Sequence, residues 1–248
     1  MPSIHLFKKT IFLFLLFCTV LHAQSAQEIM QKVDANQRGK NIYMQMNMSI
    51  TSQGHKRTMK MQAWGEGNKK SFVKTIYPPK DRGITFLSLD NQMWQYVPKI
   101  ERIIKIPPSM MLQNWMGSDI TNDDIVKQSS LVDDYDAKTL KYQGDIVSIE
   151  LIPKEDAAVV WGKIITTINT KTYTSKQAIF YDEDGQEVRT FIYEKVKKFA
   201  NYYMPTYWKI VPSNKQNSFT EIIIEDVKYD TEISEQYFKK SALKRFSR

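Results

Sequence analysis

The feature that most limits the fold of this chain is an alternation of apolar and polar side chains, carried by many short runs. Successive side chains of an extended strand point to opposite faces, so a period of two predicts strands with one buried face. Turn signals such as Asp184-Gly185 follow about every eight to twelve residues, which is typical of a sandwich or barrel. Residues 42–50 show the alternation most clearly, with an apolar face of Ile42, Met44, Met46, Met48 and Ile50.

The periodicity gives about twelve such runs, and no strand–helix alternation separates them. We therefore predict a mainly β protein. The first half holds residues 42–50, a return strand with Met59 and Met61, residues 69–77, a hairpin around Asp90-Asn91 and the run RIIKI. The second half holds TLKYQ, IVSIELI, GKIITTINT, SKQAIFYD, EVRTFIYEKV, MPTYWKIV and FTEIIIEDVKY.

Two segments depart from this pattern. In residues 25–38 the apolar side chains have helical spacing, Ser25 and Glu28 form a capping-box pattern, and Gly39 offers a stop. This predicts a short amphipathic helix. Residues 109–137 lack clean alternation. We predict that they form a loop with one or two short helices that lies over the sheet.

The N-terminus has the pattern of a signal peptide. Lys8 and Lys9 precede the apolar run at residues 10–21, and small residues follow it. The run is shorter than the ~20 residues that a membrane span needs, although an uncleaved anchor is the alternative. We place the cleavage after Ala23. This gives a signal peptide at residues 1–23, a single domain at residues 24–248, and export to the periplasm.

The rest of the chain is poor in the residues of many catalytic and metal sites. Cys18 lies inside the predicted signal, so beyond it the chain has no cysteine, and His55 is its only histidine. A Cys/His zinc site and a thiolate nucleophile are therefore excluded. Glycine-rich phosphate loops are absent as well. We expect neither a cofactor nor a metal.

The charge is basic. The chain carries a net charge of +8, of which Lys8 and Lys9 contribute two. Export argues against nucleic acid, so an anionic membrane surface or an acidic partner fits better. The last ten residues include five basic ones. They form either a contact to an anionic surface or, as chain ends more often do, a solvated, mobile terminus.

Acidic residues gather at Asp119, Asp123 and Asp124 and again at residues 133–136. Their spacing matches no calcium loop. Helix caps and solvated loops are the ordinary roles of such residues. An acid/base pair formed by Asp119 and Asp123, as in a glycan hydrolase, is the catalytic alternative.

The methionines have two interpretations. Five of them fall between Met44 and Met61. Methionine is a flexible gap-filler in cores, and it also suits apolar surfaces that adapt to different ligands. Periodicity alone does not separate core packing from a ligand-binding surface.

Residues 77–124 carry a more specific signal, in DRG, MWQYVP, the following Arg102 and WMGSDITNDD. With these motifs the chain resembles the LolA-like outer-membrane lipoprotein-sorting family. The resemblance implies an unclosed antiparallel half-barrel, with helices covering its concave face and an apolar cavity beneath them. It also implies a non-enzymatic carrier of lipoprotein acyl chains. Some relatives are linked to RND-type inner-membrane transporters.

We therefore expect a monomeric periplasmic carrier or chaperone that binds a lipid or lipoprotein acyl chain and moves it toward the outer membrane. The helix at residues 25–38 and the segment 109–137 would act as lids. A sensor or accessory subunit that docks on an RND-type transporter is the alternative. The predicted cavity lining is Met44, Met46, Met48, Ile50, Met59 and Met61, and the predicted rim or lid contacts are Trp94, Tyr96, Trp115 and Met116.

Overall fold

The computed structural model describes residues 24–127 and 131–248. The predicted signal peptide lies outside these residues. Within them, no helix has the length and apolarity needed to cross a membrane. The strands are β1 (Asn41–Ser52), β2 (His55–Glu66), β3 (Lys70–Tyr77), β4 (Thr85–Leu89), β5 (Gln92–Val97), β6 (Arg102–Ile106), β7 (Tyr135–Gln143), β8 (Ile146–Pro153), β9 (Lys163–Asn169), β10 (Thr174–Tyr181), β11 (Glu187–Phe199), β12 (Tyr202–Pro212) and β13 (Phe219–Tyr229).

The helices are short. The α-helices are α1 (Ala26–Arg38), α2 (Asn122–Lys127), α3 (Leu131–Asp134) and α4 (Lys240–Arg245). The 3-10 turns are η1 (Pro98–Ile100), η2 (Pro108–Met110), η3 (Trp115–Gly117) and η4 (Glu235–Phe238).

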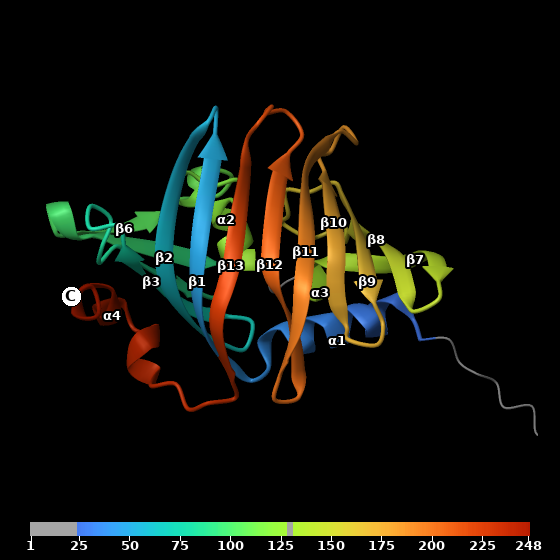
Figure 1. Ribbon diagram of the computed structural model, residues 1–248, viewed down its shortest axis with the longest axis horizontal. Helices are drawn as coiled ribbons and strands as arrows, with labels where there is room; N and C mark the ends of the chain where they lie inside the picture. The colour runs from blue at the N-terminus through green and yellow to red at the C-terminus, as the bar shows by residue number, and fades with distance from the viewer. Residues whose placement is uncertain (1–23, 128–130) are drawn as a thin grey trace, which may run out of the picture.

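All thirteen strands of the described residues join one antiparallel sheet, in the order β6-β5-β4-β3-β2-β1-β13-β12-β11-β10-β9-β8-β7. The sheet does not close, so the predicted open half-barrel is confirmed. The first six strands and the last seven each form a meander, and β1 joins the two through β13. Figure 1 shows the resulting row of strands, with α1 running across them.

This topology decides where the segment between β6 and β7 lies. The two strands form opposite edges of the sheet, yet they are consecutive in the chain. The connection, residues 107–134, must therefore cross the whole width of the sheet. It carries α2 and α3, which Figure 1 shows behind the strands. The predicted helical insertion over the sheet is confirmed, but β7 begins at Tyr135, inside the range predicted for the loop.

The predicted N-terminal helix is confirmed. Ser25 caps α1, and both hydrogen bonds of the capping box to Glu28 are present. Gly39 ends the helix at a φ of 57°. A Cβ there would lie 2.7 Å from Asp230 Oδ1, so only glycine fits. The apolar stripe of α1 faces the sheet and is buried through Ala26, Ile29, Met30 and Val33.

The sheet has two apolar faces. The inner face, as we call the one covered by α1 and the β6–β7 connection, holds the main core. Met46 pairs with Met61 and Met48 pairs with Met59 between β1 and β2, which confirms the predicted alternation. Met48, Met59 and Met61 are completely buried.

A second core lies on the outer face, opposite the first, and the C-terminal residues cover it. Phe238, Ala242 and Leu243 are buried against strand residues that include Phe72 and Leu87. The prediction of a solvated, mobile C-terminus is therefore wrong. Apolar side chains at helical spacing give η4 and α4 a buried stripe, while the basic side chains among them point outward.

Candidate functional site

An apolar cavity of about 290 Å³ lies between the inner face and the segments that cover it. Its walls come from α1, from strands in both halves of the sheet and from the β6–β7 connection. A few polar side chains, among them Asn36, Asp123 and Asp124, also border it. Its main apolar lining is Met30, Val33, Met44, Met46, Trp115, Ile120, Val126, Leu151, Ile164, Ala178, Phe180, Phe191, Tyr193, Trp208 and Ile222.

The β6–β7 connection covers the cavity with its own apolar residues, and we call residues 111–127 the lid. Trp115, Ile120 and Val126 are buried in the inner-face core. A tight turn holds the first two in place: the hydroxyl of Ser118 donates to the carbonyl of Trp115 at 2.7 Å, and the Ile120 amide donates to that hydroxyl at 3.2 Å. The lid is thus a structured cover and not a loose loop.

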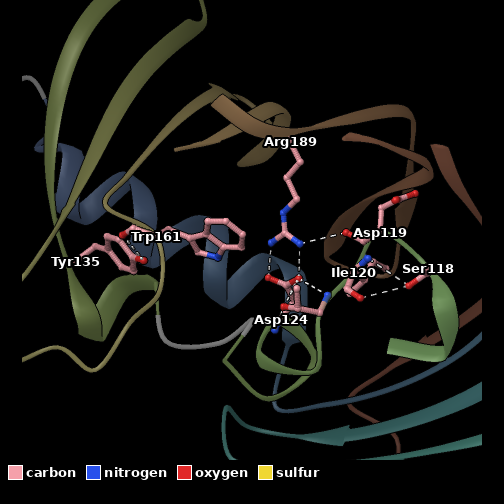
Figure 2. Close-up of polar contacts among 8 residues, drawn as sticks. Ser118, Asp119, Ile120, Asp124, Tyr135, Trp161 and Arg189 are labelled. Carbon is pink, nitrogen blue, oxygen red and sulfur yellow. Dashed lines mark hydrogen bonds and ion pairs between the residues drawn. The ribbon is translucent and has the colours of Figure 1, made fainter. Parts of the chain in front are cut away.

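One buried ion pair fastens the lid to the sheet. Arg189 of β11 is 3% exposed and donates from Nη1 to Asp124 Oδ2 at 2.6 Å and from Nη2 to Asp124 Oδ1 at 2.5 Å. Nη1 also donates to the backbone carbonyl of Asp119 at 3.1 Å. Figure 2 shows this paired contact reaching from the sheet to the lid. Such bidentate pairs are the stronger kind of charged hydrogen bond.

Aromatic rings surround the same guanidinium. Its central carbon lies 4.3 Å from the ring centre of Trp161, 4.7 Å from that of Phe180 and 5.0 Å from that of Phe191. These distances fit cation–π contacts. All three rings also line the cavity. The lid's attachment and the cavity wall are therefore built from the same side chains.

Two tyrosines of the cavity wall remain neutral in this environment. Burial raises the pKa of both Tyr135 and Tyr193 well above the ordinary value. The Tyr135 hydroxyl donates to the carbonyl of Trp161 at 3.2 Å, which ties β7 to the loop that carries the tryptophan (Figure 2). Both tyrosines thus contribute uncharged surface to the wall next to the lid, where the charged groups are Asp123 and the Arg189–Asp124 pair.

The carboxylates Asp119 and Asp123 have separate environments. The Asp119 carboxylate accepts from the hydroxyl of Thr220 at 2.7 Å and lies 3.5 Å from Lys215 Nζ. Asp123 is 6% exposed and borders the cavity. Asp119 thus anchors the lid to β13, an arrangement that does not favour an acid/base pair. Within residues 24–127 and 131–248, no cluster of three or more candidate ligands could hold a metal ion.

The structure distributes the predicted site residues over three places. Met44, Met46 and Trp115 line the cavity. Ile50 and Met116 are partly buried against the inner-face core, in which Met48, Met59 and Met61 are completely buried. Trp94 and Tyr96 lie on the outer face, in the second core beneath α4. They do not share a site with the other eight residues, because the alternation of β5 turns them away from the inner face.

Most of the aromatic wall was not part of the predicted site. Phe180, Phe191, Tyr193 and Trp208 come from strands in the second half of the sheet, and Trp161 comes from the loop between β8 and β9. Arg189 is the residue that could have indicated this wall. It lies two residues before Phe191 and four before Tyr193, so the alternation of the strand places all three side chains on the same face. A cation among inward-facing positions needs a buried partner, and that requirement points to an acid of the lid.

The open antiparallel sheet with a covered cavity is a LolA-like half-barrel fold. A family described as uncharacterized protein matches residues 67–245, and the chain belongs to that family. No curated protein matches the chain.

Solved structures agree on the fold. A DUF1329 family protein from Desulfovibrio piger superposes with a TM-score of 0.80 at 21% identity, over 88% of this chain and 97% of its own. An outer membrane lipoprotein-sorting protein domain from Vibrio parahaemolyticus gives 0.78 at 21% identity, over 89% and 98%. A LolA superfamily protein from Nitrosomonas europaea gives 0.74 at 20% identity, over 89% and 100%.

Proposed function

We propose that the protein is a periplasmic carrier that holds the hydrocarbon chain of a lipid or lipoprotein in the inner-face cavity and moves it toward the outer membrane. The observation that carries the proposal is an apolar cavity walled by the sheet and covered by a lid. Catalysis has no part in it. We assign direct ligand contact to Met44, Met46 and Trp115, and we regard the buried methionines as the support behind them.

The energetics favour a long chain over a small molecule. Burying hydrocarbon is worth about 0.8 kcal/mol per CH₂, so a chain of about sixteen carbons gains on the order of 10 kcal/mol before ordering costs. The cavity of about 290 Å³ is at the lower end of ligand pockets, which span roughly 300–1,000 Å³. A long chain therefore requires the lid to move outward.

The lid would compete with the ligand for the same apolar surface. Trp115, Ile120 and Val126 occupy part of the inner face in the closed state. A ligand that pushes these side chains outward replaces their contacts with the inner face of the sheet by its own. Affinity is then set by the ligand's preference for the open state over the closed one.

A cavity-filling substitution tests the proposal. We expect Met46→Trp, which adds bulk to the cavity wall, to abolish uptake of a fluorescent fatty acid at unchanged secondary structure. Ile223→Trp adds the same ring to an outer-face position that is 49% exposed, so it should bind the probe like the unchanged protein. Lipid extraction and native mass spectrometry of protein purified from its own periplasm provide the second measurement. Protein that is always empty, together with probes that never bind, would overturn the proposal.

A further inference from the structure

The sheet ends at β6 in an edge that carries exposed apolar side chains. All seven residues from Lys99 to Lys105 are exposed. Ile100, Ile103 and Ile104 are 55%, 45% and 39% exposed. Within the described residues β6 pairs with β5 alone, so its outward amides and carbonyls are free to pair with another strand.

The opposite edge is protected. On β7 the Ala137 amide donates to the side chain of Gln27 in α1 at 3.1 Å. A bulge between Thr139 and Lys141 interrupts the strand, and Lys138 and Lys141 stand on it. Side-chain caps, bulges and lysines are the usual means by which proteins block strand addition. The fold thus closes one edge and leaves the other accessible.

The surroundings of β6 are positively charged. Lys99, Arg102 and Lys105 are exposed, and in the part of the chain that the structure describes none of them forms an ion pair. Lys240 of α4 joins them, since its Nζ lies 4.6 Å from the ring centre of Trp94 and that of Lys105 lies 5.8 Å from it. Glu101 is the single acid in the run 99–105.

We propose that β6 is a docking edge for an extended, acidic segment of a partner protein, which adds a further antiparallel or parallel strand to the sheet. Main-chain hydrogen bonds would supply affinity, and alternate side chains of the partner would contact Ile103 on one face and Ile104 on the other. The surrounding cations select acidic flanks. A lipid surface suits this edge less well, because hydrocarbon leaves the free amides and carbonyls unsatisfied.

This docking edge is separate from the cavity, so it goes beyond the carrier function and is testable without a lipid. The probes are three labelled, acetylated peptides: EETVTVTVEE with acidic flanks, KKTVTVTVKK with basic flanks, and EETVPVTVEE with a proline that breaks main-chain pairing. Fluorescence anisotropy measures binding to the full chain, and hydrogen–deuterium exchange locates it.

We expect the acidic peptide to bind and to slow amide exchange in β6 but not in β7. The proline and basic peptides should bind about tenfold more weakly or worse, a difference of about 1.4 kcal/mol. Arg102→Glu with Lys105→Glu should cost the acidic peptide a similar factor. Lys138→Glu with Lys141→Glu on the protected edge is the matched control and should change nothing.

Four outcomes would overturn the proposal. One is an absence of exchange protection at about 1 mM peptide, a concentration that detects even weak pairing. Equal protection of β6 and β7 is the second, and equal binding of the proline peptide is the third. The last is protection of β6 by vesicles of phosphatidylglycerol and phosphatidylcholine where the acidic peptide gives none, which would mark the edge as a membrane contact.

Discussion

Replacing Asp124 with asparagine tests whether the Arg189 pair holds the lid closed. The Asp124 carboxylate accepts four hydrogen bonds, two from Arg189 and two from the amide and hydroxyl of Thr121 at 2.7 and 2.8 Å. An asparagine side chain of the same shape keeps one acceptor oxygen. Its amino group then faces a donor, and the buried guanidinium loses its counter-charge.

The size of the effect follows from burial. Arg189 is 3% exposed, and removing one partner of a buried ion pair costs about 3–5 kcal/mol. Opening the lid lets the guanidinium reach water, so the cost falls on the closed state. A loss of about 3 kcal/mol raises the open-to-closed ratio by roughly two powers of ten, at about 1.4 kcal/mol per factor of ten. Because the ligand binds the open state, its apparent affinity rises by up to the same factor.

Two measurements separate this effect from simple destabilisation. Titration with a fluorescent fatty acid should give a lower apparent dissociation constant for Asp124→Asn, and amide exchange should accelerate in residues 118–124. The control is Asp145→Asn, which removes an exposed pair with Lys171 and should change neither quantity, since such pairs are worth about 0–1 kcal/mol. If the Asp124 variant melts earlier while its ligand affinity and lid exchange stay unchanged, the pair stabilises the fold and does not gate the cavity.

Two further predictions concern the covering segments. Leu243→Ala should lower the free energy of unfolding by about 2–5 kcal/mol, because Leu243 of α4 is completely buried in the second core. Denaturant titration measures this loss, and Leu140→Ala at a 47% exposed position should cost little. The hydroxyl of Tyr202 and the Lys40 amide hold the pKa of Asp230 below its ordinary range. Above the unfolded pKa of about 3.9, this carboxylate therefore stabilises the α1–β1 turn. The stabilisation is lost as the pH falls through the lower folded pKa. Asp230→Asn should therefore show a smaller loss of stability between about pH 5 and pH 2, and identical acid profiles for both proteins would contradict this.

The sheet could be predicted because each strand carries its own evidence. Alternation in residues 42–50 and a turn at Gly54 place β1 and β2, and the register then follows from matching apolar faces. The sequence could not separate the methionines that line the cavity from those that are buried in the core. Met44 and Met48 both point to the inner face, yet Met44 lines the cavity and Met48 is completely buried. Which of them stays accessible depends on the segments above, and periodicity contains no information about those segments.

The prediction of a solvated C-terminus was wrong for a related reason. Its five basic residues dominated the interpretation, although Phe238, Ala242 and Leu243 stand among them at helical spacing. A six-residue helix has no independent stability, so only the outer face of β3, β4 and β5 could decide its structure. The same gap explains why the sequence assigns Trp94 and Tyr96 to the cavity. The alternation of β5 does not say which of its faces α4 covers, and α4 covers these two side chains on the outer face.

Arg189 connects the lid to the cavity, because it pairs with Asp124 of the lid and also contacts the aromatic rings of the cavity wall. The strand order forces the β6–β7 connection across the inner face, and the inward-facing cation on β11 needs an acid from that connection. Trp161, Phe180 and Phe191 surround this cation and also form the cavity wall. A hydrocarbon chain that packs on these rings therefore changes the environment of the ion pair. Linkage then requires reciprocity between lid and ligand: if opening the lid tightens ligand binding by a given factor, the bound ligand shifts the lid of the unchanged protein toward the open state by the same factor.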